Sequence, residues 1–426
     1  MNPLNRRQFL GTAAGALALS QLPARGAASA AGSRPVKLGL IGCGWWGMVV
    51  VKAAFKAGGA EVVALCDVDN EHLRRSAEEV EKLQGSRPAT FKLHEELLAT
   101  PGLEAVIIAT PPQWHALQFI AALERGLDVY CEKPLAYDVR EGQAMAAAAA
   151  RSDRVVQIGF QRRQSPVLRE VRQLLADGRI GRVVQAEAQI HYKAQPVSSA
   201  PESPPASLDW DRWCGPGPLL PYSPQVGHGH WRLEKAVGNG HLVDWGIHLI
   251  DATRVLLDLG APHAVTAAGG IYQLRDRITT PDALVAHFEF ERCPLTWRHR
   301  LWGAEEYAPE LNNGITLFGD RGTLFVSDTK WVLIPAGGAG REEHEVRADT
   351  SVLHAQEFLA AVRERRAPSC TTADAHVSTI AVQLAMIAWE TGARIGWDHE
   401  AAQLAGPDAA QRLLQRDYRA PWRRPA

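Results

Sequence analysis

The sequence lacks an excess of charge of either sign. It holds 46 Lys and Arg residues against 47 Asp and Glu residues, so the net charge of the 426-residue chain is −1. Proteins that bind nucleic acid usually carry a basic patch or stripe that raises the net charge. This composition gives no sign of such a surface, and we expect no nucleic-acid partner.

Long apolar runs are also missing. A transmembrane helix needs about 20 consecutive apolar residues, and no run in this chain is long enough, so we expect no membrane partner. Hydrophobic residues make up 46% of the sequence and charged residues 22%, as in an ordinary globular protein. A chain of 426 residues exceeds one typical domain, which favours two.

Cysteine is scarce, and the six cysteines lack the spacing of a metal-ligand set. Cys43, Cys66 and Cys131 end apolar segments, where cysteine is usually a small buried hydrophobic residue. We therefore predict no disulfide framework. A metal site made from His228, His230 and His241 is a weak alternative, because a His-x-His pair has no ligand-spaced partner here. We predict no metal.

The first thirty residues differ from the rest. Arg6 and Arg7 precede a mild apolar run from Leu10 to Leu22, and Ala28–Ala30 offers small residues at a cleavage position. This pattern is typical of a twin-arginine signal peptide, and a disordered basic tail or a short helix is the alternative. We predict that residues 1–30 direct export to the periplasm through the twin-arginine machinery. Such proteins cross the membrane folded, which also disfavours a disulfide framework.

Apolar strands alternate with helical patterns in the first part of the chain. The strands are expected within 36–47, 60–69, 104–110, 127–134 and 154–160, and the helices at 46–57, 71–83, 114–125 and 138–151. Such alternation is typical of a parallel sheet with helices on both faces. We therefore predict an α/β domain over residues 33–157.

Consecutive strands follow in the second part. A helix at 165–176 precedes strands at 183–192, 263–272, 283–291, 295–302 and 315–328, with a turn at 319–322, and helices at 354–366 and 376–392 close the chain. Strands without intervening helices favour an antiparallel sheet, so we predict an α+β domain over residues 158–426. The Pro-rich stretch 195–224 contains Trp210, Trp213 and Tyr222, which predict an ordered loop packed over something.

A glycine motif marks a dinucleotide site. Gly42-x-Gly44-x-x-Gly47 follows a strand and opens a helix, where glycines permit a tight turn, a close pyrophosphate and close helix packing. Asp67 ends the next strand, and its carboxylate can bind a ribose 2′-hydroxyl and repel a 2′-phosphate. The motif predicts NAD as cofactor, with NADP less favoured. The expected contacts here are Gly42, Gly44, Trp45, Trp46, Gly47 and Asp67.

A second constellation lies in the stretch GNGHLVDWGIHLID, residues 238–251. Asp244 and His248 are four residues apart, and residues four apart on a helix share one face. Gly238, Gly240 and Gly246 surround them and are expected to leave room for a substrate and for close packing. The stretch predicts an acid/base pair in a cleft. The alternative is a helix with one structural histidine.

Several motifs in order support a family resemblance. They are GLIGCGWWG, CDVD, ATPPQWH at 109–115, CEKPLA at 131–136, DGRIG at 177–181 and Asp-x-x-x-His at 244–248. Together they resemble the glucose–fructose oxidoreductase / inositol dehydrogenase / rhizopine-catabolism oxidoreductase family over nearly the whole mature chain. The resemblance implies a Rossmann domain joined to an α+β domain with a large open, mostly antiparallel sheet. It also implies a homodimer or homotetramer, and a nicotinamide in the cleft between the domains.

The resemblance also assigns residues to the cleft. Lys133 would point into it with Glu132 nearby, and the cofactor would be lined by Thr110, Pro111 and His115. The residues expected to contact substrate are Arg162, Arg163, Trp231, Arg232, Asp244 and His248.

Asp244, His248 and Lys133 would carry the chemistry. His248 would accept the proton of a hydroxyl group while hydride leaves for the nicotinamide. Asp244 would orient the His248 ring or stabilise its charged form. Lys133 would stabilise the developing alkoxide.

The predicted export constrains the reaction. Free NAD should be scarce beyond the membrane, so a dehydrogenase that releases its cofactor would stall there. We therefore expect a carbohydrate oxidoreductase with tightly bound NAD and a redox-neutral net reaction on a sugar, cyclitol or glycoside hydroxyl. It could oxidise one sugar and reduce another, or oxidise transiently, eliminate and reduce back, a route to NAD-dependent glycoside hydrolysis. A non-catalytic sugar- or nucleotide-binding protein on the same scaffold is the remaining alternative.

Overall fold

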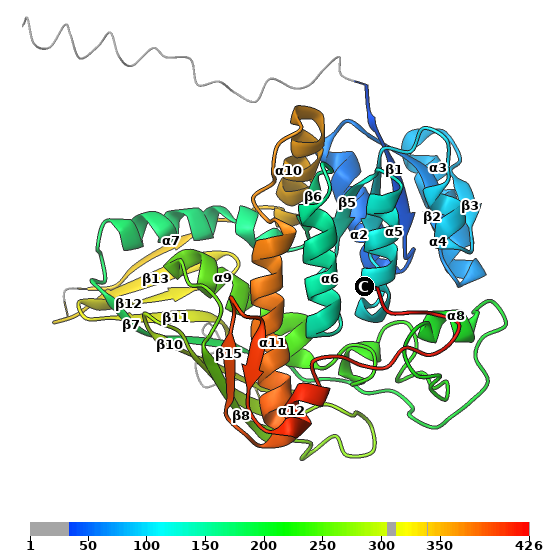
Figure 1. The fold of residues 1–426 in the computed structure, drawn as a ribbon. Coiled ribbons are helices and arrows are strands. Elements are labelled where there is room, and N and C mark those ends of the chain that lie inside the picture. The colour runs from blue at the N-terminus through cyan, green and yellow to red at the C-terminus, as the bar shows by residue number, and fades with distance from the viewer. Residues whose placement is uncertain (1–33, 305–311, 339, 426) are drawn as a thin grey trace, which may run out of the picture. The chain divides into compact units, whose positions relative to one another are not determined.

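The computed structural model describes residues 34–304, 312–338 and 340–425. The predicted signal peptide over residues 1–30 lies outside these ranges. From Val36 onward the chain forms one compact unit with a six-stranded and a ten-stranded sheet. The long helix α11 (Thr372–Thr391) stands between the two sheets (Figure 1). In the described part of the chain, every helix is too short or too polar to cross a bilayer.

The first sheet is parallel, with strand order β3-β2-β1-β4-β5-β6. Its strands are β1 (Val36–Ile41), β2 (Ala60–Cys66), β3 (Ala89–Phe91), β4 (Ala105–Ile108), β5 (Asp128–Cys131) and β6 (Val156–Ile158). The order reverses at β1, which pairs with both β2 and β4. Dinucleotides bind at such a reversal, beyond the carboxyl ends of the strands. The predicted Rossmann fold is confirmed.

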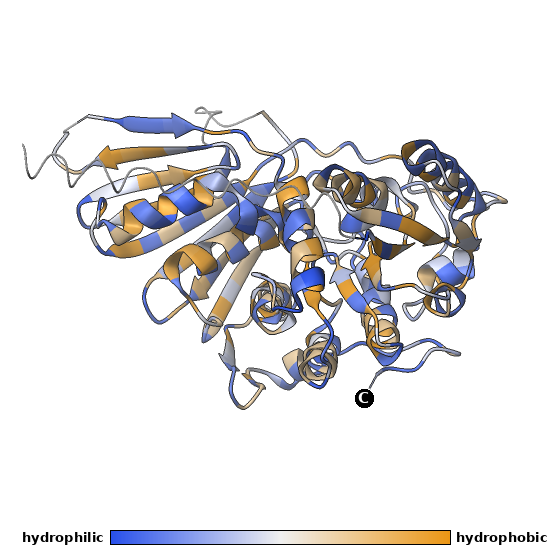
Figure 2. Ribbon diagram, turned by 90° about the horizontal axis from the view of Figure 1, so that it is seen from above, coloured by the Kyte–Doolittle hydropathy of each residue, from blue (hydrophilic) through white to orange (hydrophobic). Residues whose placement is uncertain are grey.

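Helices cover this sheet. They are α2 (Trp45–Ala57), α3 (Asn70–Gln84), α4 (His94–Leu98), α5 (His115–Glu124) and α6 (Val139–Ala150). Each of the longer helices buries one face, as α3 does through Leu73, Ala77 and Val80. Figure 2 shows apolar and polar residues on different faces of the helices. The short elements β3 and α4 were not predicted, because three and five residues are too few for a periodic signal.

The second sheet is mostly antiparallel, as predicted. Its order is β14-β13-β12-β11-β7-β10-β9-β8-β15-β16, and among the described strands of this sheet only the β7–β10 pair is parallel. The strands are β7 (Val183–Ile190), β8 (Ala264–Gly270), β9 (Ala283–Glu289), β10 (Pro294–Arg300), β11 (Asn313–Gly319), β12 (Gly322–Val326), β13 (Lys330–Pro335), β14 (Glu342–Glu345), β15 (Ile395–Asp398) and β16 (Gln403–Ala405).

The remaining helical elements connect the sheets. They are η1 (Pro112–Trp114), η2 (Gln161–Gln164), α7 (Pro166–Ala176), α8 (Trp210–Cys214), η3 (Trp231–Leu233), the π-helical turn η4 (Leu242–Gly246), α9 (Ile247–Leu257), α10 (Thr350–Glu364) and α12 (Asp408–Arg412). All six cysteines are free and buried, and Cys43, Cys66 and Cys131 lie at or just beyond strand ends as predicted.

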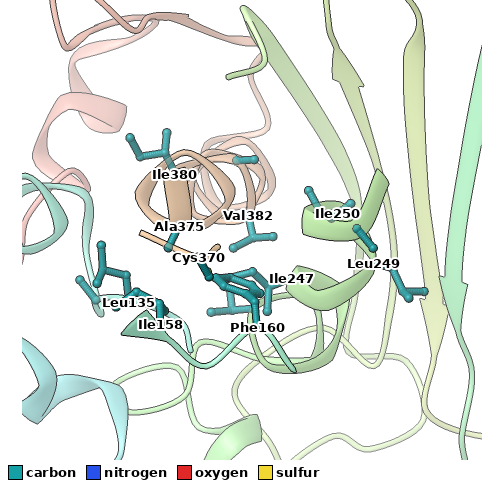
Figure 3. Close-up of a cluster of buried hydrophobic side chains, with 14 of the residues drawn as sticks. Leu135, Ile158, Phe160, Ile247, Leu249, Ile250, Cys370, Ala375, Ile380 and Val382 are labelled. Atoms are coloured by element: carbon teal, nitrogen blue, oxygen red, sulfur yellow. The ribbon is translucent and has the colours of Figure 1, made fainter. Parts of the chain in front are cut away.

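A buried cluster fixes the start of α9 against the first sheet. Figure 3 shows Ile158 and Phe160, at and beyond the end of β6, beside Ile247 of α9. Val382 of α11 lies in the same buried cluster. The apolar packing therefore places the first turn of α9 beside the carboxyl ends of the first sheet's strands.

Helix α10 packs on the first sheet although it follows the strands of the second in sequence. Phe358 is 2% exposed and belongs to the same core cluster as Leu38 of β1 and Val51 of α2. Its ring also meets Tyr130 of β5 at 5.7 Å between ring centroids. The two parts of the chain therefore share core contacts.

Truncation of Phe358 tests this shared core. We expect Phe358→Ala to lower the free energy of unfolding by about 3 kcal/mol or more, because a fully buried aromatic ring leaves a cavity. The surface variant Leu83→Ala is the control, since Leu83 is 51% exposed, and should change it by less than about 0.5 kcal/mol. Denaturant titration followed by tryptophan fluorescence measures both. Equal effects of the two variants would contradict the packing described.

Candidate active site

The glycine motif forms a cradle at the start of α2. Gly42 has φ +94°, and a Cβ there would lie 2.8 Å from the backbone of Ala109. A Cβ on Gly47 would lie 2.0 Å from the Gly42 carbonyl oxygen, whereas one on Gly44 would meet no atom within 4 Å. The first helical hydrogen bond runs from the Met48 amide to the Gly44 carbonyl. The backbone amides of residues 45–47, in the first turn of the helix, are thus available to an anion, and the cradle fits a pyrophosphate.

Asp67 follows β2 and faces the same crevice. Its two carboxylate oxygens accept hydrogen bonds from the backbone amides of Cys43, at 2.6 Å, and Asp69, at 2.8 Å. Burial raises the pKa of Asp67, while these two donors favour its charged form. The amides also hold the carboxylate in one orientation. The arrangement fits recognition of ribose hydroxyl groups.

A cavity of about 330 Å³ connects these features. The predicted cofactor residues Gly42, Gly44, Trp45, Trp46, Asp67, Thr110 and Pro111 line it. Its size and its mixture of aromatic and polar walls are typical of a small-molecule site. The structure therefore gathers these predicted residues around one space.

Residues 207–232, which we name the cover segment, form another wall of this cavity. The cover segment pairs with residues 68–70, which follow β2. Leu208 forms a β-bridge with Asp69, the Asn70 amide donates to the Ser207 carbonyl, and the Asp209 amide donates to the Val68 carbonyl. This backbone pairing docks the cover segment beside Asp67, at the predicted ribose site.

Tryptophans tie the cover segment to the rest of the cavity. The Trp114 indole donates to the Arg212 carbonyl at 3.0 Å, and the Gln113 amide donates to that of Trp213 at 3.2 Å. Trp422, in the C-terminal segment that runs back towards α8 in Figure 1, meets Trp114 edge-on. Sequence reasoning missed Trp114, Arg212, Trp213 and Trp422 as cavity residues. The tryptophans at 210 and 213 signalled only an ordered loop, and nothing in the pattern signalled Trp422.

Lys133 and Asp244 are in direct contact. The Lys133 ammonium donates to Oδ1 of Asp244 at 2.7 Å and to its backbone carbonyl at 2.6 Å. The other carboxylate oxygen pairs with Nε of Arg232 at 3.1 Å. Burial disfavours a charged Asp244, but Lys133 and Arg232 outweigh it and lower the pKa of this carboxyl. The side chains of Lys133 and Asp244 are only 12% and 9% exposed, so the pair is nearly dry.

The expected pairing of Asp244 with His248 is not formed. Asp244 lies in the π-helical turn η4, and His248 lies in the first turn of α9. Among the hydrogen bonds of the described residues, none joins the two side chains. Asp244 therefore positions Lys133, not the His248 ring.

His248 is held in its neutral form. Burial, followed by the charges of Lys133 and Arg162, lowers its pKa well below 6.5. The ring packs edge-on against Phe160, and its Nδ1 has no hydrogen-bond partner in the described chain. His248 does not line the cavity described above, but its neutral imidazole has the chemistry to accept a proton from a hydroxyl group.

His115 supports the site from behind. Its ring is completely buried, with Nε2 at 2.9 Å from the Thr110 carbonyl and Nδ1 at 2.9 Å from that of Pro134. Burial lowers its pKa. The ring thus links the Thr110 turn with the loop that carries Lys133. It is a positioning residue. Contrary to the prediction, it does not line the cavity.

Glu132 is also a supporting residue. It is 3% exposed, and its carboxylate accepts hydrogen bonds from Gln161, at 2.8 Å, and from the Tyr130 hydroxyl. Burial raises its pKa. A Cβ on Gly159 would lie 2.7 Å from this carboxyl group, so only glycine fits there without a shift. Glu132 therefore holds the Lys133 loop and is absent from the cavity wall.

The glycines around Asp244 serve packing and do not open space. A Cβ on Gly238 would lie 2.5 Å from Cα of Arg232. One on Gly246 would lie 2.8 Å from Leu242 and 3.0 Å from the ring of Trp297, which is fully buried. The expectation that these glycines leave room for substrate is corrected accordingly.

The four predicted substrate contacts outside the catalytic set divide into two groups. Trp231 and Arg232 line the cavity, with the Arg232 guanidinium stacked 4.6 Å from the Trp231 ring. Arg163 is only 5% exposed and pairs with Asp251 and Asp374. Arg162 pairs with Asp328 at 2.6 Å. The predicted substrate contact of Arg163 is thus replaced by a structural ion-pair network between η2, α9 and α11.

Removal of Arg163 tests its structural role. Arg163→Ala leaves Asp251 buried without its partner, so we expect the free energy of unfolding to fall by about 3 to 5 kcal/mol. The neighbouring Arg162→Ala removes a half-exposed pair and should cost about 1 kcal/mol or less. Denaturant unfolding measures both variants. A stable Arg163→Ala protein with impaired substrate binding would instead restore the original prediction.

Three models of known protein families match successive parts of this chain. Residues 36–160 match a model described as "Oxidoreductase family, NAD-binding Rossmann fold". Residues 168–325 match "GFO/IDH/MocA C-terminal domain", and residues 346–424 match "Oxidoreductase family, C-terminal alpha/beta domain". The three matches follow one another along most of the described chain.

Individual relatives are more distant. Inositol 2-dehydrogenase 4 of Saccharopolyspora erythraea is 34% identical over 152 residues, which cover 35% of this chain and 44% of that protein. A glycosyl hydrolase family 109 protein of Stenotrophomonas maltophilia is 37% identical over 138 residues, 31% of this chain and 30% of the relative. The chain thus spans less than half the length of these relatives.

The solved structure of levoglucosan dehydrogenase in complex with NADH and levoglucosan shares the fold. Its TM-score is 0.68 at 19% identity, over 85% of this chain and 99% of that one. The three family-model matches show that this chain belongs to the Gfo/Idh/MocA oxidoreductase family.

Proposed function

We propose that this chain oxidises a hydroxyl group of a sugar, cyclitol or glycoside by hydride transfer to NAD. The observation that carries the proposal is the contact between Lys133 and Asp244, at 2.7 Å, beside a cavity built on a dinucleotide cradle. Burial and, after it, the positive charge of Lys133 lower the pKa of His248. The names of relatives, inositol 2-dehydrogenase among them, support a polyhydroxylated substrate.

The chain's residues divide the chemistry between them. Bound NAD⁺ would supply the hydride acceptor. Neutral His248 accepts the proton of the substrate hydroxyl, and the Lys133 ammonium stabilises the negative charge that develops on its oxygen. Asp244 orients Lys133, because it holds the ammonium through two oxygens. Arg232 and Trp231 contact the sugar from the cavity wall.

Asp67 supports NAD as the preferred dinucleotide. Its carboxylate is fixed by two backbone amides at the end of β2 and faces the cavity. An anion in this place accepts hydrogen bonds from ribose hydroxyls and repels a 2′-phosphate.

The cover segment supports retention of the cofactor between turnovers. It pairs with the first sheet's region through backbone hydrogen bonds, and Trp213 and Trp422 close further parts of the wall. A retained cofactor must be reduced and reoxidised in place. The net reaction is then redox-neutral, with one substrate oxidised and a second reduced on the same bound NAD.

A glycoside hydrolase is the second candidate. The relative named glycosyl hydrolase family 109 protein favours it. Transient oxidation acidifies the neighbouring C–H, so a base can then promote elimination of the glycoside oxygen, followed by water addition and reduction. A chain that releases free sugar from a glycoside without net NADH formation would perform this reaction.

Export and self-association complete the proposal. Arg6 and Arg7 with the following apolar run support twin-arginine export to the periplasm. Apolar side chains on the second sheet, Val184, Val285 and Ile334, are each more than 40% exposed and support a homodimer or homotetramer.

Replacement of Lys133 tests catalysis against simple binding. We expect Lys133→Met to lower turnover by about 100-fold or more, because it removes the charge that stabilises the alkoxide. Bound nucleotide should be retained, since the glycine cradle and Asp67 that line the cavity are unchanged. Reduction of bound NAD by a panel of sugars, cyclitols and glycosides measures turnover. Lys235→Met, at an exposed pair with Glu390, is the control. Unchanged function of Lys133→Met would favour the non-catalytic alternative.

The pH profile tests His248 as the proton acceptor. A base works in its neutral form, so the oxidation rate falls only as the pH drops below its pKa. Because the pKa of His248 lies well below 6.5, kcat/KM for oxidation should stay level through pH 6.5 and decline only at more acidic pH. His248→Gln should lose this acidic limb together with most activity. A decline centred at or above pH 6.5 would exclude His248 in this environment.

A further inference from the structure

Three potential metal ligands meet where the cover segment docks on α3. Asp69, His72 and His228 each offer one ligand atom, and these atoms lie within 4.8 Å of one another. Nε2 of His228 is 2.8 Å from Oδ2 of Asp69. The rings of His72 and His228 lie 4.2 Å apart between centroids, at 36°. Two imidazoles and a carboxylate thus converge from segments 159 residues apart.

The carboxylate is already oriented. Oδ1 of Asp69 accepts the amide hydrogen of Glu71 at 2.8 Å as the cap of α3, which turns Oδ2 towards His228. Asp69 is 3% exposed. In metal sites the ligating carboxylate is commonly held in this way by a second hydrogen bond.

The histidines are the more accessible members. His72 and His228 both line the cavity, whereas Asp69 lies behind them. Among the described residues, the ring of His72 has no hydrogen-bond partner; it stacks on His228 and interacts electrostatically with Asp67 and Asp69. A simple His228–Asp69 hydrogen bond therefore docks the loop but does not account for the second imidazole.

We propose that Asp69, His72 and His228 bind one divalent transition-metal ion, for which Zn²⁺ is the best-suited probe. Nitrogen and carboxylate ligands suit zinc, and three protein ligands leave a position open to water. Tetrahedral ligands at about 2.1 Å from a metal lie roughly 3.4 Å from one another. The pair at 2.8 Å must open slightly and His72 must approach, which rotation of the side chains supplies.

This set differs from the one that the sequence offered. Of His228, His230 and His241, only His228 takes part. His241 is buried and its Nε2 faces the Ile190 carbonyl at 3.2 Å. Local spacing could not show the site, because two ligands come from α3 and its cap and the third comes from the cover segment.

A metal here would act as a clip on the cover segment. It would tie His228 of the cover segment to Asp69. Asp69 lies two residues after Asp67, the proposed ribose ligand. The open coordination position would face the cavity, since His72 and His228 form its wall. The clip would therefore slow opening of the cover segment and release of the cofactor. Metal binding itself does not depend on the proposed function.

Zinc titration of the untagged, chelator-treated full chain tests the site. Calorimetry and metal analysis should find about one Zn²⁺ per chain. Affinity should fall by about 100-fold or more in His72→Ala, in His228→Ala and in Asp69→Asn, which keeps the helix cap. His230→Ala, two residues from His228, is the matched control and should bind as the parent does. No stoichiometric binding, or equal binding by all variants, would overturn the proposal.

A second readout separates the site from its consequence. The rate at which NAD leaves the chain is measured with and without one equivalent of Zn²⁺. A slower release that is lost in His72→Ala supports the clip. Zinc binding with an unchanged release rate supports the metal site and overturns the clip. If the chain never binds NAD, the proposed function fails while the zinc titration still decides on the metal site.

Discussion

The ion pair between Lys133 and Asp244 is the constraint on which the site depends. It joins residues 111 apart in sequence, one beyond β5 of the first sheet and one in the turn before α9. Burial of two charges costs several kcal/mol of desolvation, which only good geometry offsets. Here the backbone carbonyl of Asp244 and the Arg232 guanidinium complete the pair. The π-helical turn presents that carbonyl and carboxylate together, and buried packing around Ile247 holds the turn in place.

The sequence predicted the parts of the site that depend on local backbone geometry. The glycine cradle, Asp67 at the end of β2 and the Lys133 loop each follow from a short motif. Relations between distant segments were not predictable. Nothing local indicates that Asp244 meets Lys133 and not His248, or that Arg163 is engaged by Asp251 and Asp374. The π-turn also carries no periodic signal, because its sequence fits a regular helix equally well.

The cover segment connects the fold with the proposed reaction. A long insertion between β7 and α9 leaves the second sheet, pairs with the region after β2 and walls the cofactor cavity. We propose that this wall retains the cofactor, so that one NAD molecule is reused from cycle to cycle. The His228 contact at the same place would strengthen that closure further. Retention of the cofactor is therefore the claim that unites the sequence, the cavity and the chemistry.

The most direct measurement is the nucleotide content of the purified protein. The chain is prepared without added cofactor and denatured, and the released nucleotide is identified and quantified by mass spectrometry. The account predicts NAD⁺ or NADH at close to one molecule per chain. A protein that carries no nucleotide and binds NAD only weakly would contradict the retained cofactor and indicate a conventional dehydrogenase. Stoichiometric NADP would contradict the assignment of Asp67.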